Sequence, residues 1–254
     1  MTGVIRVTAV IPVYNHELAV PAVAAALRQH DLPVVLVDDG SNETCRAALE
    51  RLAAETGDQL VRLPINGGKG AAVIAGLRHA RELGYTHALQ VDADGQHDLR
   101  DVPKFLAAAR AEPEAVICGR PVFDASIPKV RFVSRYITHV LVWLQTLSLS
   151  AVRDSMCGFR LYPIRTVLEV VDRDGVGTRM DFDVELLVKL VWRGRTLRWL
   201  DTRVSYPTDG ISHFRMGLDN LRLAGMHVRL VLGMLWRVPL LLWRRMRHAA
   251  PPPP

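Results

Sequence analysis

Apolar runs of strand length alternate with stretches of helical periodicity along the first half of this 254-residue chain. The expected strands, rich in Val, Ile and Leu, are residues 7–13, 33–37, 59–63, 87–91 and 115–118. The expected helices are residues 19–29, 43–55, 70–83 and 99–110. This alternation is typical of an α/β fold in which a mostly parallel sheet is covered by helices on both faces.

Polar clusters follow each of the first four expected strands. They are Tyr14-Asn15-His16-Glu17, Asp38-Asp39-Gly40-Ser41, residues 64–70 and residues 92–98. Ligands in parallel sheets bind at the carboxyl ends of the strands, so we expect all four clusters to meet at one edge. Each cluster alone also fits an ordinary turn or helix cap, and their common position is the stronger indication of a binding site.

The most informative cluster is Asp92-Ala93-Asp94-Gly95-Gln96-His97. Two carboxylates, with Gln96 as a further oxygen donor, are too few to enclose a metal. A hard divalent cation bound there keeps positions open for water or a diphosphate. The spacing is not that of an EF-hand, because Pro103 stands in the place of the closing glutamate. A solvated Asp-Gly turn is the alternative that these residues alone leave open.

Three further segments suit a phosphate-bearing ligand. Asn66-Gly67-Gly68-Lys69-Gly70 offers backbone N–H groups and one cation, although it also fits a flexible helix start and is not a Walker A loop. Arg120 follows an expected strand and can pair with a phosphate through two hydrogen bonds. Asp183 and Glu185 lie in the first turns of an expected helix, where acids also simply suit the helix dipole.

The second half of the chain is less regular. Residues 130–152 and 181–193 have helical patterns, and residues 196–206 resemble a strand. A long apolar and basic segment follows, and the chain ends in four prolines. We predict a domain of residues 1–214, interfacial helices over residues 215–248 and a disordered tail of residues 249–254.

Charge and cysteine content narrow the class of function. The net charge is +6, and arginine is concentrated after residue 215 among Leu, Val, Met and Trp. This mixture suits a lipid headgroup boundary better than a nucleic-acid groove, and no nucleic-acid partner is expected. Cys45, Cys118 and Cys157 are widely spaced and predict neither a disulfide framework nor a zinc site, which favours a reducing cytoplasm. The first residues are not typical of a signal peptide.

Two helical segments are predicted to lie in a membrane interface. The arginines of residues 215–248 share one stripe at about 100° per residue, and residues 130–152 carry a similar stripe. Arg229 and Arg237 interrupt the segment too early for a span of about 20 apolar residues. We expect the arginines to reach lipid headgroups on the cytoplasmic face of a membrane, from a peripheral or monotopic protein. A spanning helix and a buried helix of a homo-oligomer are the alternatives.

Taken together, these motifs resemble those of family 2 glycosyltransferases of the GT-A fold, most of all dolichyl- and polyprenyl-phosphate mannose or glucose synthases. The matching motifs occur in family order and are Val10-Ile11-Pro12-Val13-Tyr14-Asn15, Val37-Asp38-Asp39-Gly40-Ser41, Asn66-Gly67-Gly68-Lys69-Gly70, Asp92-Ala93-Asp94-Gly95-Gln96-His97, Gly158-Phe159-Arg160 and Phe182-Asp183-Val184-Glu185. Each motif is weak alone, whereas the ordered set is specific.

The resemblance implies a nucleotide-sugar site. The residues expected to bind the donor are Pro12, Tyr14, Asn15, Glu17, Asp39, Gly68, Lys69, Asp92 and Arg215. Those expected to bind Mg²⁺ or Mn²⁺ are Asp92, Asp94 and Gln96. Those expected at the acceptor are Arg120, Arg131, Ser134 and Arg160. The expected catalytic residues are Asp92, Asp94, Arg120 and Asp183.

The expected activity is an inverting, metal-dependent transfer of a sugar from a nucleotide diphosphate to polyprenyl phosphate or another lipid-linked acceptor. A lipid phosphate is already an anion, whereas a neutral hydroxyl needs a general base. Asp154, Asp183 and Glu185 are the candidate bases, and Asp183 is preferred. A nucleotidyltransferase and a catalytically inactive, membrane-bound scaffold of the same fold are the alternatives.

Overall fold

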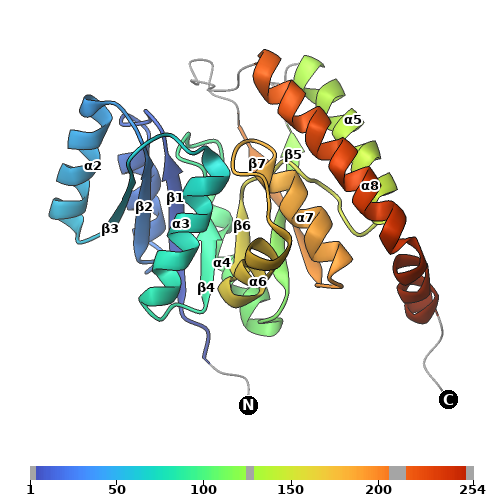
Figure 1. Cartoon of the computed structure of the whole chain (residues 1–254). Helices are drawn as coiled ribbons and strands as arrows, with labels where there is room; N and C mark the ends of the chain where they lie inside the picture. The colour runs from blue at the N-terminus through green and yellow to red at the C-terminus, as the bar shows by residue number, and fades with distance from the viewer. Residues whose placement is uncertain (1–3, 124–128, 206–215, 250–254) are drawn as a thin grey trace.

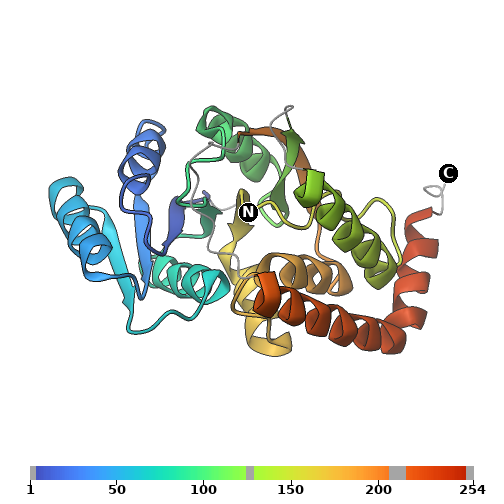
Figure 2. The ribbon, with the colours of Figure 1, turned by 90° about the horizontal axis from the view of Figure 1, so that it is seen from above.

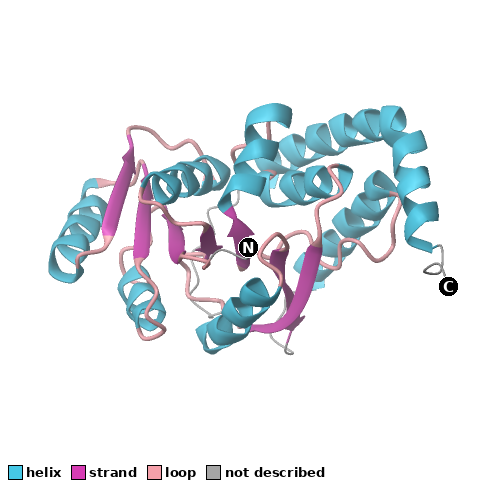
Figure 3. Cartoon of the chain, turned by 90° about the horizontal axis from the view of Figure 1, so that it is seen from below, coloured by secondary structure: helices cyan, strands magenta, loops and turns pink. Residues whose placement is uncertain are grey.

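The computed structural model describes residues 4–123, 129–205 and 216–249, which form one seven-stranded sheet with helices on both faces (Figure 1 and Figure 3). The strands are β1 (Val7–Val13), β2 (Val34–Asp39), β3 (Gln59–Leu63), β4 (His87–Gln90), β5 (Val116–Phe123), β6 (Arg160–Pro163) and β7 (Leu197–Val204). The helices are α1 (Val20–Arg28), α2 (Glu43–Thr56), α3 (Lys69–Glu82), the short 3-10 helix Leu99–Asp101, α4 (Val102–Ala111), α5 (Lys129–Thr146), α6 (Ile164–Asp174), α7 (Phe182–Trp192) and α8 (Met216–Ala249).

The predicted mostly parallel sheet is confirmed, with one strand that the sequence did not indicate. The strand order is β3-β2-β1-β4-β6-β5-β7, and β6 runs antiparallel to both β4 and β5. β6 was missed because four strand residues are too few to show a period. α6 was also missed, although its 11 residues carry buried apolar side chains such as Val167 and Val171. As β6 runs the opposite way, its first residue, Arg160, pairs with Gln90 at the carboxyl end of β4.

The helix expected over residues 130–152 ends earlier, at Thr146. Leu147 has a φ of +50°, and a residue in this left-handed region ends a helix. Residues 147–159 are irregular and lead from α5 to the start of β6. The shorter helix therefore leaves Asp154 and Gly158 in a loop at the sheet edge rather than near a helix end.

Alternation along β1 divides the core into two layers. Ala9, Ile11 and Val13 pack in the layer of α1, α2 and α4, whereas Val10 packs in the layer of α3 and α6 to α8. α3 approaches the sheet closely at Gly76, where an added Cβ would lie 2.4 Å from Val10 Cγ1. Because α3 follows β3, its N-terminus lies at the carboxyl edge of the sheet, where Lys69 reaches Asp92 in the loop after β4.

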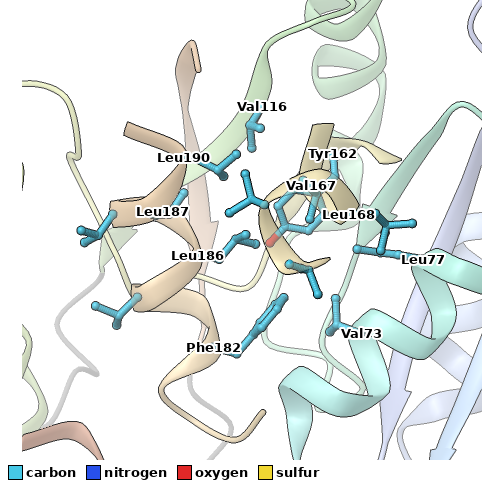
Figure 4. Close-up of a cluster of buried hydrophobic side chains, with 14 of the residues drawn as sticks. Val73, Leu77, Val116, Tyr162, Val167, Leu168, Phe182, Leu186, Leu187 and Leu190 are labelled. Carbon is cyan, nitrogen blue, oxygen red and sulfur yellow. The ribbon is translucent and has the colours of Figure 1, made fainter. Parts of the chain in front are cut away.

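The central helix of the second layer is α7, of whose 11 residues nine are buried. Its apolar side chains, including Phe182 and Leu187, pack with residues of α3, α6, β5 and β6 (Figure 4). The same helix carries Asp183 and Glu185 into the interior. Acidic side chains are rarely buried unless they are paired, so both need partners there.

At the end of the sheet that carries β7, α5 and α8 pack against each other and against α7 (Figure 1 and Figure 2). Residues on one side of α8, such as Met226, Leu230 and Met234, are buried against these helices. The opposite side is exposed and apolar. We call it the α8 apolar face, and it comprises Leu221, Val228, Leu232, Leu235, Trp236 and Trp243. α8 also bends in its C-terminal part, and Pro239 lies inside it (Figure 2).

The described arginines of α8 divide into two groups: Arg222 and Arg229 are exposed, whereas Arg237 and Arg244 are half-buried. Arg229 lies 3.5 Å from the Glu185 carboxylate, the Arg237 guanidinium lies 4.5 Å from the centre of the Trp192 ring, and Arg244 donates to the Trp192 carbonyl. These three arginines therefore bind groups that α7 supplies, namely a carboxylate, an aromatic ring face and a backbone carbonyl, and Arg237 and Arg244 do not reach outward as predicted.

The outward side of α8 is instead apolar. Within the described residues, Gly217–Arg244 of α8 is the one stretch long and apolar enough to cross a membrane, judged by length and composition alone.

Replacing Leu187 with Ala should lower the free energy of unfolding by about 2–5 kcal/mol, because the fully buried side chain leaves a cavity in the α7 core. Urea denaturation followed by circular dichroism measures the loss. Leu240→Ala is the control, since Leu240 is 41% exposed on α8 and the change should stay within about 0.5 kcal/mol. Equal losses in the two variants would contradict the central position of α7.

Candidate active site

An ion-pair cluster lies at the carboxyl end of β4. Lys69 Nζ lies 2.8 Å from Asp92 Oδ1 and 2.8 Å from Asp183 Oδ2. The three residues come from the start of α3, the loop after β4 and the start of α7. Their side chains are 17%, 24% and 7% exposed, so the cluster opens to solvent mainly through Asp92.

A buried polar layer supports this cluster from below. Arg160, at the start of β6, donates to the Asp183 and Ser155 carbonyls and lies 3.4 Å from Asp183 Oδ1. Gln90 Nε2 donates to Asp183 Oδ1, and the Tyr162 hydroxyl donates to Gln90 Oε1. Hydrogen bonds in such a dry layer rigidify the groups they join, so Asp183 is held in one position.

Gly158 lies directly against the Lys69–Asp92 ion pair. An added Cβ there would lie 2.5 Å from both Lys69 Nζ and Asp92 Oδ2. The position therefore excludes every larger residue as long as the ion pairs keep their geometry. Asp154 fixes the loop before Gly158, because its Oδ1 accepts hydrogen bonds from the backbone N–H groups of Met156 and Cys157.

The charges of the cluster shift the pKa values of its carboxyl groups in opposite directions. Burial opposes ionisation of Asp92, but Lys69 and His97 outweigh burial and hold its pKa well below the usual range. Burial and then the negative charge of Asp92 raise the pKa of Asp94. Burial also works against the charged form of Lys69, but Asp183 and Asp92 raise its pKa above the ordinary lysine value. Asp92 and Lys69 are therefore both charged near neutral pH.

A second loop pair lies beside the cluster. Asp39, at the end of β2, accepts hydrogen bonds from the N–H groups of Gly67 and Gly68 at 2.8 and 2.9 Å. These two N–H groups are thus already engaged, whereas the sequence suggested that they were open to a phosphate. Burial is the largest influence on Asp39 and raises its pKa, although these two hydrogen bonds act in the other direction.

Arg179 covers the same loop. It donates to the side-chain and backbone oxygens of Asn66 at 2.9 and 3.1 Å, and the Thr178 carbonyl accepts from the Ala71 N–H. Gly68 has a φ of +97° and lies against Arg179, so only glycine suits the position. The loop before α7 is thereby fixed to the loop before α3.

The loop after β1 completes this edge of the sheet. Asn15 has a φ of +53°, its N–H donates to Ser41 Oγ, and its Oδ1 accepts from the Asn42 N–H. The N-cap of α2 is Asn42, so the preceding cluster Asp38-Asp39-Gly40-Ser41 does not serve as the helix cap. Nearby, Glu17 Oε2 is buried and has no hydrogen-bond partner. Buried carboxylate oxygens normally have a donor, so Glu17 is suited to accept one from a ligand.

The comparisons with known proteins agree with this arrangement. The family model for glycosyl transferase family 2 matches residues 8–168, from β1 into α6. The chain belongs to glycosyl transferase family 2. It is 31% identical over 248 residues to dolichyl-phosphate beta-glucosyltransferase of Homo sapiens, covering 85% of this chain and 74% of that one. It is also 27% identical over 190 residues to undecaprenyl-phosphate mannosyltransferase of Micrococcus luteus, covering 69% and 75% of the two chains.

Solved structures show the fold of this glycosyltransferase. Glucosyl-3-phosphoglycerate synthase of Mycobacterium tuberculosis, in complex with Mn²⁺, UDP and phosphoglyceric acid, matches with a TM-score of 0.63. The match covers 90% of this chain and 76% of that one at 16% identity. The GT-A fold expected from the motifs is therefore confirmed.

The residues of the glycosyltransferase fit a divalent cation at Asp92. His97 is 6% exposed in its side chain, its Nε2 lies 3.5 Å from Asp92 Oδ2, and neither ring nitrogen has a hydrogen-bond partner. Asp92 Oδ1 accepts no hydrogen bond either, since the approach of Lys69 Nζ lacks the geometry of one. Asp94 Oδ1 accepts the Gln96 N–H.

In the described part of the chain, no three His, Cys, Asp or Glu side chains gather to hold a metal alone. A metal here would take further ligands from outside the protein.

Several predicted residues have other partners. Arg160 was expected at the acceptor, but it is 1% exposed, so we assign it the support of Asp183 instead. Arg120 forms an exposed, bidentate ion pair with Asp201 on β7. Its role at the acceptor stays a prediction. Arg131 and Ser134 lie in α5 at positions whose side chains are not described, and Arg215 and the proline tail lie outside the described residues.

The candidate general bases are all engaged. Asp154 pairs with Arg135 of α5 through two hydrogen bonds of 2.6 and 2.7 Å. Glu185 accepts the Gly177 N–H and pairs with Lys189 at 2.8 Å. Asp183 contacts Lys69, Gln90 and Arg160. Cys157 is no nucleophile, because burial raises the pKa of its thiol to about 12.

Sequence analysis missed three supporting residues, namely Gln90, Tyr162 and Arg179. Gln90 carried a signal, since it is a polar residue within an otherwise largely apolar strand. Tyr162 lies on the unpredicted strand β6, and Arg179 lies in an irregular loop without periodicity. Their roles depend on contacts between segments that are 72 to 113 residues apart along the chain, such as the 113-residue separation of Arg179 and Asn66.

Replacing Gly158 with Ala should leave the glycosyltransferase folded and lower its transfer rate by about 10²-fold. The new Cβ meets only the ends of Lys69 and Asp92, which can move aside, and such a displacement costs activity rather than stability. Thermal unfolding and sugar-transfer rates measure the two effects. Gly217→Ala is the control, because an added Cβ meets nothing within 4 Å there. Full activity of the Gly158 variant would contradict the assigned site.

Proposed function

We propose that this family 2 glycosyltransferase moves a sugar, with inversion and with Mg²⁺ or Mn²⁺, from a nucleotide diphosphate to a polyprenyl phosphate or another lipid-linked acceptor at a membrane surface. The observation that carries the proposal is the cluster of Lys69, Asp92 and Asp183 at the carboxyl edge of the sheet. It combines a carboxylate with unused coordination capacity and a cation beside it, which is what a departing diphosphate requires.

The donor would lie along the edge formed by the loops after β1, β2, β3 and β4. Glu17 Oε2 and the Asp39 carboxylate are acceptors suited to ribose or base N–H and O–H groups. Pro12, Tyr14 and Asn15 form the adjoining loop, and Arg179 and Lys69 supply positive charge near the diphosphate. Asp92 and Asp94, with Gln96, would hold the metal, which supplies Lewis-acid neutralisation of the leaving diphosphate.

The transfer itself is a single displacement at the anomeric carbon. An acceptor oxygen forms a bond to this carbon while the bond to the diphosphate oxygen breaks, and the electron pair leaves with the diphosphate. Because attack and departure occur on opposite sides, the configuration inverts. The chain's part is to orient the two substrates and to stabilise the charge that builds on the diphosphate.

The acceptor is proposed to be a phosphate because the three candidate bases are already engaged. The carboxylates of Asp154, Asp183 and Glu185 are held by cations or N–H groups. A phosphate monoester is an anion near neutral pH and attacks without deprotonation, whereas a sugar hydroxyl needs a base. The names of the human and Micrococcus luteus relatives, which specify dolichyl and undecaprenyl phosphate, support the same class of acceptor.

The membrane contact is proposed to be the α8 apolar face, with the neighbouring exposed side chains Tyr136, Ile137, Val140 and Leu144 of α5. Apolar patches of this extent on a protein surface mark interaction sites. Arg229, Arg237 and Arg244 contact α7, so the apolar side of α8 is left for lipid. The free, buried cysteines suit a reducing compartment, which supports the cytoplasmic face.

Asp92→Asn and Asp94→Asn should each lower sugar transfer by about 10²- to 10³-fold, because each removes a carboxylate proposed to hold the cation that neutralises the departing diphosphate. The assay uses liposomes that contain undecaprenyl or dolichyl phosphate, GDP-mannose or UDP-glucose, and Mn²⁺ or Mg²⁺, and measures labelled sugar in the lipid phase. Asp172→Asn is the control, since Asp172 of α6 forms an exposed ion pair with Arg78 of α3 and does not belong to the Asp92 cluster.

The products of the same assay separate the alternative functions. A glycosyltransferase releases a nucleoside diphosphate, whereas a nucleotidyltransferase releases pyrophosphate. No turnover by the wild-type protein with either donor and either lipid would support an inactive scaffold. Unchanged transfer in both aspartate variants would contradict the proposed metal site.

The double variant Leu232→Gln, Leu235→Gln should weaken binding to anionic liposomes by at least about 10²-fold. Each leucine side chain that leaves water contributes about 1.5–3 kcal/mol to such binding. Liposome co-sedimentation measures the affinity. Val4→Gln with Leu83→Gln is the matched control, because both residues are exposed and lie away from α8. Undiminished binding would contradict the assignment of the α8 apolar face to the membrane.

A further inference from the structure

Lys69 occupies a position that is unfavourable for a cation. It is the first residue of α3, where the helix dipole is positive and disfavours a positive charge. Its side chain is also only 17% exposed, so the ammonium group has lost most of its water. Burial alone works against the charged form, yet the neighbouring carboxylates raise the pKa of Lys69. The position is therefore stable only because specific acids surround the ammonium group.

Those acids differ in how firmly they are held. Asp183 is fixed by Arg160 and Gln90 as well as by Lys69. Lys69 Nζ lies 2.8 Å from Asp92 Oδ1 and donates to Asp92 Oδ2 at 3.0 Å, whereas the next cationic group, His97 Nε2, is 3.5 Å from Oδ2. If the Lys69 ammonium group leaves Asp92, it keeps its contact with Asp183. Asp92 is thus the carboxylate that Lys69 can give up.

The same carboxylate is the proposed ligand of the divalent cation, so two cations compete for it. A divalent ion that binds alone adds two positive charges next to Lys69 and weakens the Lys69–Asp92 pair. A nucleotide diphosphate removes this conflict, because its oxygens can coordinate the metal and accept hydrogen bonds from the ammonium group.

We propose that Lys69 makes divalent-cation binding depend on the nucleotide diphosphate: it competes with the metal for Asp92 when the metal arrives alone, and it moves to the diphosphate when both arrive together. The inference rests on the proposed function and adds an order to it, since the metal enters the site with the donor. Lys69 is then a positioning residue for the metal as well as a donor-binding residue.

The test is the affinity for Mn²⁺, measured by electron paramagnetic resonance of the free ion, with Mn²⁺ alone and with Mn²⁺ plus UDP or GDP. Lys69→Met removes the charge and keeps most of the side-chain volume. We expect it to bind Mn²⁺ alone at least tenfold more tightly than wild type. In wild type, we expect the nucleotide to increase the affinity for Mn²⁺. In the variant, this increase should be at least tenfold smaller.

Two further variants serve as controls. Arg78→Met removes one positive charge from the exposed part of the same helix and should change neither affinity. Lys69→Arg keeps the charge and should retain weak binding of Mn²⁺ alone. Thermal unfolding establishes that each variant is folded. If Lys69→Met does not fold, Lys69→Gln replaces it, because its amide can still donate to Asp92.

The outcomes separate this inference from the proposed function. If wild type binds Mn²⁺ more tightly with nucleotide and Lys69→Met binds Mn²⁺ alone no more tightly than wild type does, the role given to Lys69 is wrong and the metal-dependent transfer stands. If wild type binds Mn²⁺ neither alone nor with either nucleotide, the metal site and the inference fail together. Equal tightening in Arg78→Met would show a general charge effect and would also overturn the inference.

Discussion

The contact of Lys69 with Asp92 and Asp183 is the interaction on which the rest of the site depends. It joins the first residue of α3, the loop after β4 and the start of α7, which are far apart in the sequence. Burying any one of these three charged side chains without the others would destabilise the fold, because burial of an unpaired charge is costly. The buried layer of Gln90, Arg160 and Tyr162 holds this contact in one geometry, and Gly158 leaves the space that it needs.

The same helix that carries Asp183 also connects the site to the outer helices. Glu185, two residues on, binds the Gly177 N–H on one side and lies near Arg229 of α8 on the other. Trp192, at the end of α7, receives Arg237 and Arg244 of α8 and donates to the Gln145 carbonyl of α5. On the other side of the site, Arg135 of α5 binds Asp154, which shapes the loop before Gly158. The helices proposed to meet the membrane are thus in direct contact with the loops of the active site.

Much of the fold could be predicted from local pattern. The apolar runs of β1 to β4 and the periodicity of α1 to α4 defined the parallel half of the sheet, and the motifs at the strand ends indicated the edge that carries the site. The predictions were wrong where the signal is short or depends on distant partners. β6 has four residues, the end of α5 is set by the left-handed Leu147, and the inward direction of Arg237 and Arg244 is set by α7.

The chemistry of the site was therefore present in the sequence as residue types at strand ends, since backbone periodicity and turn residues are local properties. Tertiary structure alone decided which of these groups meet. Lys69 could serve a phosphate or a carboxylate, and Arg160 could face an acceptor or the interior, because both side chains are long and bind any oxygen within reach. Only the antiparallel insertion of β6 beside β4 and the burial of α7 against α3 and α6 determined that both cations bind Asp183.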